Sequence, residues 1–278
     1  MSNADRPLSG KVAWVTGSSR GLGRVIATHL GSLGAAVVVH GTTPTSAQAF
    51  NEAASLDDVA AGVARDSGAE VLRIWGDVTN QDHVTRMVGE VQDRFGRIDI
   101  LVNNAGGDIG AAGTGGPGGG KPQPNDAVFI PLPDVRAVMD RNFMSCVMVC
   151  KAVVPGMMER KQGWVVNIAS VAAHRSREQL AIYGAAKAAV THYSRSLADQ
   201  LRPYNIPVNV ISPGGTVTPR FLATNNPDPA KVGLSGTLDR YAEPIEVARA
   251  VAFLVADPGA FVSGQVIRVD GGSQLWPA

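Results

Sequence analysis

A tyrosine and a lysine four residues apart, Tyr183 and Lys187, open an alanine-rich run that is typical of the start of a helix. Residues at this spacing share one face of a helix, so the two side chains should project together. The ordinary pKa of a phenol is about 10, and a neighbouring ammonium group lowers it toward neutral pH. The pair is therefore a candidate site for proton transfer.

A serine lies upstream of this pair, where it could take part in the same chemistry. Ser170 follows residues 164–168, whose short, apolar, β-rich character predicts a buried strand. A hydroxyl presented at the strand end could polarise a carbonyl group beside the phenol. The alternative is an ordinary amphipathic helix on which the tyrosine packs and the lysine is solvated. Motifs elsewhere in the chain are needed to distinguish these two interpretations.

Length and charge are those of an ordinary globular protein. The chain has 278 residues, 45% of them hydrophobic, and a net charge of +1, which suits one large α/β domain or two small ones. No basic excess indicates nucleic acid as a partner, and no apolar run approaches the ~18 residues of a membrane span. Residues 1–8 are polar and lack the apolar core of a signal peptide.

The two cysteines, Cys146 and Cys150, lie one helical turn apart in an apolar segment. A disulfide at that spacing has poor geometry, and two thiols supply too few donors for a metal site. We therefore expect buried free thiols in a reducing, cytoplasmic protein, and no metal.

The first forty residues predict a nucleotide-binding βαβ unit. A strand over 11–15 is followed by a glycine-rich turn, a helix over about 22–33 and a second strand over 36–40. The glycines differ in spacing from the common dinucleotide fingerprint, but they would likewise let the backbone approach a pyrophosphate at the helix N-terminus. The turn carries the candidate cofactor residues Gly17, Ser19, Arg20, Gly21, Leu22 and Gly23.

The end of the second strand bears on the choice of cofactor. An acidic residue there would bind an adenosine ribose and repel a 2′-phosphate, but the chain continues His40-Gly41-Thr42 and the next acid is Glu52. Arg20 could face a 2′-phosphate, with Thr42 as a further donor. We therefore prefer NADP(H), with NAD(H) as the alternative; the competing interpretation is that Arg20 is simply solvated.

The middle of the chain continues the alternation of strands and helices. We expect a helix over 47–67, a strand over 70–75, a helix from about 80 to 94 and a strand over 99–103. Asp77, after the third strand, could contact an adenine or cap the next helix. The glycine- and proline-rich loop 106–125 should be exposed or partly disordered; it is a flap over the active site or a tolerated surface insertion.

The second half of the chain completes the pattern. A helix over about 133–159 carries Asn142, a mediocre helix former whose amide suggests a use. A strand over 207–211, a turn over 212–218, a polar loop to about 242, a helix over 244–256 and a strand over 265–269 follow. This alternation predicts a parallel, doubly wound sheet with ligands at the carboxyl ends of its strands.

Taken in order, these motifs resemble the short-chain dehydrogenase/reductase family across nearly the whole chain. The segments that match are Thr16-Gly17-x-x-x-Gly21-x-Gly23, Asp77-Val78, Asn103-Asn104-Ala105-Gly106, Asn142, Ser170 with Tyr183-x-x-x-Lys187, Pro213-Gly214-x-x-x-Thr218 and Asp270-Gly271-Gly272. The resemblance implies a single three-layer Rossmann domain over 1–278 with a seven-stranded parallel sheet, a Gly/Pro-rich loop 106–125 and a substrate loop 219–242.

The resemblance also implies roles for individual residues. Tyr183 would be the acid–base, Lys187 would lower its pKa and bind the nicotinamide ribose, and Ser170 would hold the substrate oxygen. Asn142 would position a water that links Lys187 to solvent. The remaining cofactor contacts would come from three groups of residues: Asp77 and Val78 at the adenine, Asn104, Ala105 and Gly106 at the adenosine and ribose, and Pro213, Gly214, Thr216 and Thr218 at the nicotinamide. Arg20 and Thr42 are similar to the pair in NADPH-using ketoacyl reductases.

These features favour an NADP(H)-dependent oxidoreductase that interconverts a carbonyl and a secondary alcohol on a small or medium organic substrate. A non-catalytic nucleotide-binding scaffold, and epimerase or dehydratase chemistry on the same fold, remain alternatives. The basic segment 174–177 would favour an anionic substrate, or else it is solvated or lies at a subunit contact. By resemblance, the faces of residues 143–158 and 185–201 pair to give a homodimer or homotetramer.

Overall fold

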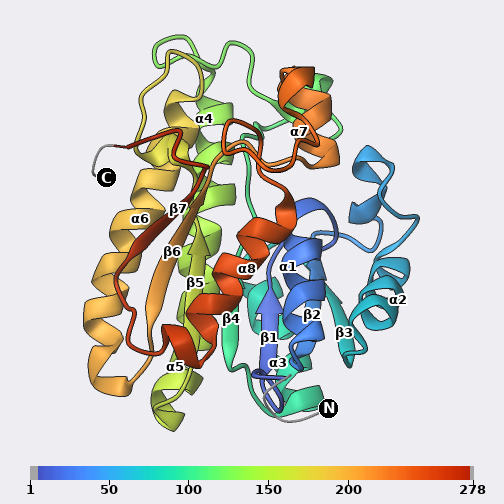
Figure 1. Cartoon of the computed structure of the whole chain (residues 1–278), viewed down its shortest axis with the longest axis vertical. Helices are drawn as coiled ribbons and strands as arrows, with labels where there is room; N and C mark the ends of the chain where they lie inside the picture. The colour runs from blue at the N-terminus through green and yellow to red at the C-terminus, as the bar shows by residue number, and fades with distance from the viewer. Residues whose placement is uncertain (1–5, 276–278) are drawn as a thin grey trace.

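A computed structural model describes residues 6–275 of the chain (Figure 1). Its centre is a seven-stranded parallel sheet with the strand order β3-β2-β1-β4-β5-β6-β7. The order runs outward in both directions from β1 and β4, which is the doubly wound arrangement that the sequence predicts. The predicted fold class is confirmed, whereas the predicted domain range 1–278 extends at both ends beyond the described residues.

The strands lie within two residues of the predicted ranges at every end. They are β1 (Val12–Val15), β2 (Ala36–Gly41), β3 (Val71–Trp75), β4 (Ile100–Asn103), β5 (Trp164–Ile168), β6 (Val208–Pro213) and β7 (Val266–Val269). The first strand shows why the central strands read as continuous apolar runs. Ala13 and Val15 join one hydrophobic cluster, and Val12 and Trp14 join another on the opposite face. Both faces are buried, so no polar residue alternates along the strand.

Helices cover both faces of the sheet. One face carries α1 (Gly21–Ser32), α2 (Leu56–Ser67) and α8 (Pro244–Val255), and the other carries α3 (Gln81–Phe95), α5 (Ser145–Arg160) and α6 (Ala181–Leu201) (Figure 1). The remaining helical pieces are α4 (Leu132–Met139), α7 (Pro219–Thr224) and several short turns. No helix among residues 6–275 is long and apolar enough to cross a membrane.

The predicted helix over 47–67 is wrong in its first half. A short 3-10 segment, η2 (Ser46–Asn51), is interrupted by positive φ angles at Phe50 (64°) and Asn51 (57°). The α-helix starts only at Leu56, where the Ser55 side chain accepts a hydrogen bond from the Asp58 backbone N–H. Both ends of this segment are held by the first glycine turn, since Arg20 Nη1 donates to the Ser46 carbonyl at 2.6 Å and Gly21 N donates to the Glu52 carboxylate at 2.7 Å. The apolar pattern alone could not show these contacts.

The predicted long helix over 133–159 exists, but a π-helical segment (Asp140–Met144) interrupts it at Asn142. The Asn142 side-chain Nδ2 donates to the Val138 carbonyl, four residues earlier, at 2.8 Å. The side chain thus uses a carbonyl that an α-helix would pair with a backbone N–H, a competition that asparagine is known for. Widened turns of this kind are often found at functional sites.

The two long loops are more ordered than their composition indicates. Within 106–125, Asp108 and Asn125 are buried although other residues of the loop are exposed, so the predicted exposed loop is correct only in part. The substrate loop 219–242 contains the short helix α7. Lys121 joins the two segments by donating to the Thr224 carbonyl at 2.7 Å, and both lie above the carboxyl ends of the strands (Figure 1). This arrangement agrees with the flap interpretation of the first loop.

Candidate active site

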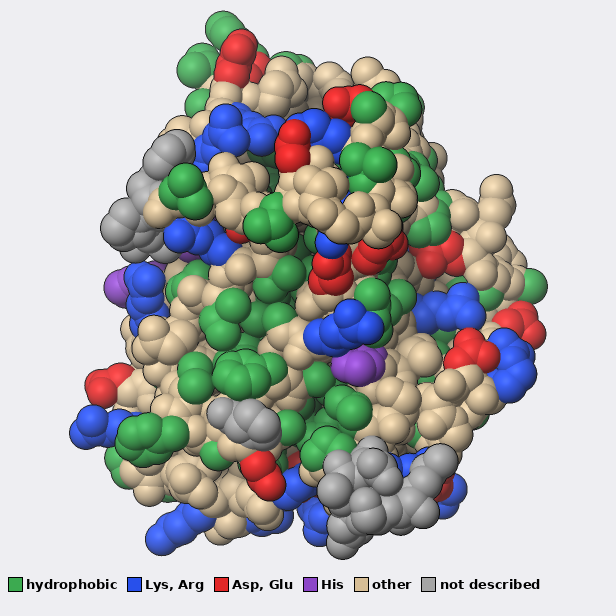
Figure 2. All heavy atoms as spheres, in the orientation of Figure 1, with side chains coloured by type: hydrophobic (Ala, Val, Ile, Leu, Met, Phe, Trp, Pro, Cys, Tyr) green, Lys and Arg blue, Asp and Glu red, His purple; other side chains and the backbone are tan. Residues whose placement is uncertain are grey.

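Two adjoining cavities open where the sheet's strands end. One has a volume of about 1350 Å³ and lies under the loops around α7, and the other, of about 670 Å³, lies along the glycine turn. Ser170, Tyr183 and Arg220 line both cavities. In Figure 2, Lys and Arg side chains gather, together with acidic ones, over the upper part of this face, where the loops that follow the strands lie.

Close packing brings Ser170 and Tyr183 together. Ser170 comes directly after β5 and Ala169, and its Oγ accepts a hydrogen bond from Ala172 N at 3.2 Å at the start of the turn η5 (Val171–Ala173). Tyr183 lies in the first turn of α6. Beside it, a Cβ atom added at Gly184 would lie only 2.8 Å from the Ala172 carbonyl oxygen. A glycine at this position therefore lets α6 approach the serine turn.

Burial dominates the acidity of the Tyr183 phenol. It raises the pKa of Tyr183; the Ser170 hydroxyl and the positive charge of Arg220 act to lower it, and the carboxylate of Asp108 raises it further. The lowered pKa that the sequence predicted is therefore absent from this structure, because desolvation outweighs the favourable charges. The phenol is protonated at neutral pH, and Arg220 acts on it in a way that the sequence did not reveal.

Lys187 occupies the predicted face of α6. Its side chain is buried, its Nζ donates to the Ile168 carbonyl at 2.8 Å, and Nζ lies 5.9 Å from the centroid of the Tyr183 ring. Burial lowers the pKa of Lys187 to about 8, against a weaker effect of Cys146 in the opposite direction. The lysine thus carries its charge at neutral pH and loses it at only slightly alkaline pH.

Asn142 is tied to the first residues of the loop 106–125. Its Oδ1 accepts a hydrogen bond from Gly107 N at 2.9 Å, and its Nδ2 donates to the Gly107 carbonyl at 2.8 Å. The side chain lies outside the two sets of cavity-lining residues. The structure therefore shows it holding the loop in place, while its predicted role in positioning a water stays a prediction.

The glycine turn is as tight as a cofactor-binding loop requires. Gly17 has a φ of 64°, and a Cβ atom added at Gly23 would lie 2.5 Å from the Gly17 carbonyl oxygen. The Asn104 side chain donates to the Thr16 carbonyl at 3.0 Å, and Thr16 Oγ1 accepts from the backbone N–H groups of Asn104 and Ala105 at 3.0 Å. The turn and the end of β4 thus form one rigid wall of the smaller cavity.

Every predicted cofactor residue lines this smaller cavity. They are Gly17, Ser19, Arg20, Gly21, Leu22, Gly23, Thr42, Asp77, Val78, Asn104, Ala105, Gly106, Tyr183, Lys187, Pro213, Gly214, Thr216 and Thr218. Asp77 does not cap the next helix. The N-cap residue of α3 is Asn80, whose Oδ1 accepts a hydrogen bond from Asp82 N at 3.0 Å. The capping alternative for Asp77 is therefore wrong, and its side chain instead accepts from Thr79 N at 2.9 Å.

Two residues of this cavity were missed as site residues. The buried His40 accepts a hydrogen bond from Gly17 N at 2.9 Å and contacts the Gly76 carbonyl at 3.0 Å, so it connects the glycine turn to the end of β3. Burial lowers the pKa of His40 to about 4. The Glu52 carboxylate accepts from Gly21 N at 2.7 Å. Only its position at the carboxyl end of a strand could have indicated the histidine, and no local signal marks Glu52.

Arg20 lies at the rim of the cofactor cavity, with a nearby countercharge. Its Nη1 donates to the Ser46 carbonyl at 2.6 Å, and its guanidinium lies 5.9 Å from the centroid of the Phe50 ring. Burial lowers the pKa of Arg20, and the neighbouring Glu52 carboxylate raises it. Arg20 is thus partly buried and positioned, which excludes the interpretation that it is simply solvated.

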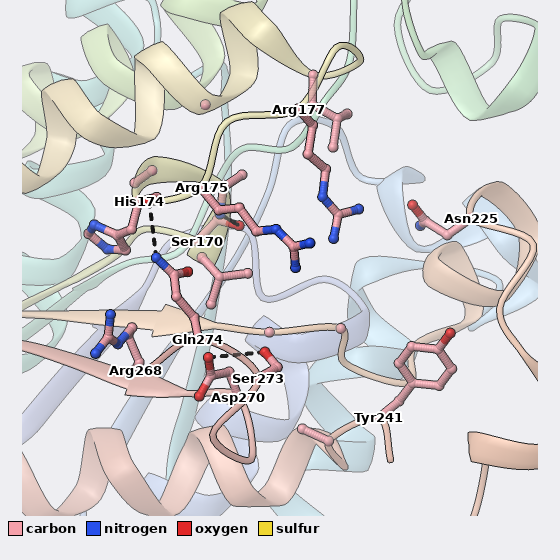
Figure 3. Close-up of a pocket in the computed structure, with 18 of the residues that line it drawn as sticks. Ser170, His174, Arg175, Arg177, Asn225, Tyr241, Arg268, Asp270, Ser273 and Gln274 are labelled. Atoms are coloured by element: carbon pink, nitrogen blue, oxygen red, sulfur yellow. Dashed lines mark hydrogen bonds between the residues drawn. The ribbon is translucent and has the colours of Figure 1, made fainter. Parts of the chain in front are cut away.

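The basic segment after Ser170 divides into two parts (Figure 3). His174 is held in place, since its ring contacts Ser212 Oγ at 3.1 Å and its carbonyl accepts from the Gln274 side chain at 3.0 Å. The side chains of Arg175 and Arg177 instead point into the larger cavity. These two arginines remain candidates for contact with an anionic part of a substrate.

The fold and this site are those of a doubly wound protein of the nucleotide-binding class, with a serine and a tyrosine where its two cavities meet. Comparison with known proteins agrees. A model of the short chain dehydrogenase family matches residues 11–228. A cyclohexanol dehydrogenase from Rhodococcus sp. is 35% identical over 275 residues, which span 96% of this chain and 97% of that protein.

Two further comparisons extend over nearly the whole chain. A 3-oxoacyl-(acyl-carrier-protein) reductase from Synechocystis sp. is 32% identical over 277 residues, spanning 97% of this chain and 99% of that protein. A solved 7α-hydroxysteroid dehydrogenase, complexed with NADH and 7-oxo glycochenodeoxycholic acid, has a TM-score of 0.80 and 28% identity over 98% of each chain. The chain belongs to the short-chain dehydrogenase/reductase family, and, like these dehydrogenases and reductases, it is an oxidoreductase acting on CH–OH groups.

Proposed function

We propose that this protein is an NADP(H)-dependent oxidoreductase that interconverts a carbonyl and a secondary alcohol, with Ser170, Tyr183 and Lys187 as catalytic residues. The observation that carries the proposal is the position of Tyr183, which lines both the cavity along the glycine turn and the larger cavity beside it. A nicotinamide in the smaller cavity and a carbonyl in the larger one would meet at this phenol.

The residues present fit a dinucleotide. The glycine turn leaves no room for side chains at Gly17 and Gly23. The first N–H of α1, on Gly21, donates to Glu52, so the next N–H groups of the helix would bind a pyrophosphate. When bound, the nicotinamide supplies or accepts the hydride. The cofactor contacts proposed for the eighteen residues named above rest on this fit and on the family resemblance.

The protein's own residues would handle the oxygen and its proton. In reduction, Ser170 and Tyr183 donate hydrogen bonds to the carbonyl oxygen, and Tyr183 then gives it a proton. In oxidation the tyrosine takes the proton back from the alcohol. Lys187, charged at neutral pH, stabilises the phenolate that forms in either case. Asn142 positions the start of the loop 106–125 through its hydrogen bonds with Gly107. We also propose that it positions a water molecule that links Lys187 to solvent.

The decisive experiment measures loss of reduced cofactor against a panel of ketones and follows the ketones themselves. Net oxidation of NADPH with alcohol as product supports the proposal. Conversion of substrate without net consumption of cofactor would instead indicate epimerase or dehydratase chemistry. Cofactor binding with no conversion of any ketone would indicate a non-catalytic nucleotide-binding protein.

The preference for NADP(H) rests on Arg20 and on the absence of an acid at the end of β2. His40 there is buried and the next side chain on the cavity wall is Thr42, so no carboxylate at the strand end repels a 2′-phosphate. The solved relative complexed with NADH makes a direct comparison of the two cofactors necessary.

Arg20→Ala tests this preference. We expect kcat/KM for NADPH to fall about 10- to 100-fold, as for loss of a hydrogen bond to a charged group, with little change for NADH. Arg24→Ala is the matched control, because Arg24 lies on the same helix, contacts Glu52 and lies outside the cavity. A wild-type enzyme that used NADH as well as NADPH would contradict the preference.

We also propose that the chain forms a homodimer or homotetramer in a reducing cytoplasm. Cys146 and Cys150 are buried and free, as the sequence predicted. The apolar faces of residues 143–158 and 185–201 would form the contact between subunits. Light scattering after size exclusion tests this directly, and a monomer at micromolar concentration would contradict it.

A further inference from the structure

Three polar side chains meet beside the catalytic tyrosine, on the substrate side of the site. Asp108 and Asn125 come from the two ends of the loop 106–125, and Arg220 comes from α7. Asn125 Nδ2 donates to Asp108 Oδ2 at 2.8 Å, and Arg220 Nη2 donates to the Asp108 carbonyl at 2.9 Å. Asp108 and Asn125 are only 5% and 3% exposed, so this cluster is built into the protein interior.

Each member of the cluster keeps a buried polar atom without a hydrogen-bond partner among residues 6–275. These atoms are Asp108 Oδ1, Asn125 Oδ1 and Arg220 Nε. A buried polar atom left unpaired costs about 1–3 kcal/mol, so native proteins contain few of them. Three in one cluster, with two of the residues lining the larger cavity, indicate that a ligand completes the hydrogen bonding.

The cluster is fixed relative to the catalytic residues. Gly107, which precedes Asp108, exchanges two hydrogen bonds with Asn142. The Asn125 carbonyl accepts from Leu180 N at 3.0 Å, three residues before Tyr183. The charges of Asp108 and Arg220 both act on the Tyr183 phenol. Asp108 and Arg220 therefore line the same cavity as Ser170 and Tyr183, which would hold the reacting carbonyl.

The unpaired atoms select a particular chemistry. Two of them, on Asp108 and Asn125, are acceptors, and the third, on Arg220, is a donor. A hydroxyl group can donate to the carboxylate and accept from the guanidinium at once. An apolar substituent would leave all three atoms unpaired, and an anion would meet the Asp108 carboxylate. A site built to bind a hydroxyl rejects analogues that lack one.

We propose that the substrate carries a hydroxyl group next to its reacting carbon, as in a hydroxyketone, vicinal diol or polyol. Asp108 and Arg220, which line the larger cavity, bind this hydroxyl, and Asn125 orients the Asp108 carboxylate through its hydrogen bond. The inference rests on the proposed oxidoreductase function and adds the class of substrate. It also assigns a use to the loop 106–125, which supplies Asp108 and the residue that orients it, Asn125.

The test compares α-hydroxycyclohexanone with cyclohexanone, two ketones that differ only in the neighbouring hydroxyl, using NADPH and NADH in parallel. We expect the wild-type kcat/KM to favour the hydroxyketone by about tenfold or more. Asp108→Asn should reduce this ratio to within about threefold of unity, because an amide is a weaker acceptor than a carboxylate. Arg220→Lys, which keeps the charge and removes Nε, should also reduce it, and it serves if Asp108→Asn does not fold.

A matched control separates hydroxyl binding from loop anchoring. Asp134 also holds this loop, since its Oδ1 accepts from Ala111 N at 2.7 Å, but it does not line either cavity. Asp134→Asn should leave the ratio of the two ketones unchanged. Equal kcat/KM values of the wild type for the two ketones, or a ratio of these values that Asp108→Asn leaves undiminished, would overturn the hydroxyl-binding inference but not the proposed oxidoreductase function. Oxidation of neither cofactor by either ketone would overturn the proposed function as well.

Discussion

Lys187 places its Nζ 5.9 Å from the centroid of the Tyr183 ring while donating a 2.8 Å hydrogen bond to the Ile168 carbonyl at the end of β5. The lysine thereby connects the catalytic helix to the strand that leads to Ser170. Its buried ammonium has a pKa of about 8. In the mechanism that we propose, proton transfer at the phenol therefore takes place near a cation that is charged at neutral pH but not far above it.

Replacing Tyr183 by phenylalanine removes the proposed proton donor and little else. We expect kcat/KM to fall about 10²- to 10⁴-fold, while the dissociation constant of NADPH changes by less than about threefold. Absorbance of the reduced cofactor measures turnover, and quenching of tryptophan fluorescence measures binding. Tyr193→Phe on the same helix is the control, since Tyr193 packs against Phe143 away from both cavities. Activity close to wild type in Tyr183→Phe would remove the mechanism.

The activity should depend on the charge of Lys187. Because burial lowers the pKa of Lys187 to about 8, its charge is complete below that pH and is lost above it. We expect kcat/KM for carbonyl reduction to decline as the pH rises through about 8. Lys187→Met should lower kcat/KM by about 10²-fold or more and abolish this decline. A variant that kept the alkaline decline would assign it to another group.

His40 should make stability depend on pH. Burial lowers the pKa of His40 to about 4, from 6.5 in the unfolded chain. On acidification, His40 therefore binds a proton in the unfolded state at a higher pH than in the folded state. Its contribution to the free energy of unfolding is fully present above about pH 6.5 and is lost as the pH falls toward 4. Urea unfolding of the wild type should show a loss of about 2 kcal/mol from this residue between about pH 7 and about pH 5.

His40→Gln removes this titration while keeping a hydrogen-bonding side chain. The variant should lose correspondingly less stability on acidification than the wild type. The exposed histidine His192, replaced in the same way, should leave the pH dependence unchanged. Identical pH profiles for the wild type and His40→Gln would show that the histidine is not held neutral by the fold.

Two helical glycines should respond in opposite ways to alanine. At Gly23 an added Cβ would lie 2.5 Å from the Gly17 carbonyl oxygen, so the glycine turn must shift. We expect Gly23→Ala to weaken NADPH binding at least tenfold and to lower the melting temperature. At Gly89 on α3 no atom lies within 4 Å of the added Cβ, and alanine should stabilise by about 0.5–1 kcal/mol. Calorimetry and cofactor titration measure both effects.

Much of the site could be predicted because its signals are local. Tyr183 and Lys187 share a helix face by spacing alone, and the glycine turn follows an apolar strand, so both could be located without a structure. The parallel sheet followed from the alternation of strands and helices. The kink at Phe50 and the π-helical turn at Asn142 could not be predicted, because each lies in a segment that is hydrogen-bonded to residues distant in the chain.

What the sequence alone determined is the class of fold and the groups that we propose to handle a proton and a dinucleotide. Only the tertiary structure decided their environment: it raised the pKa of Tyr183, buried His40 and joined Asp108, Asn125 and Arg220 from segments about a hundred residues apart. Spacing along a helix or strand sets which side chains share a face. Desolvation and contacts between distant loops depend on how the whole chain packs, and these set the acidity of the site and the substrate that we propose it accepts.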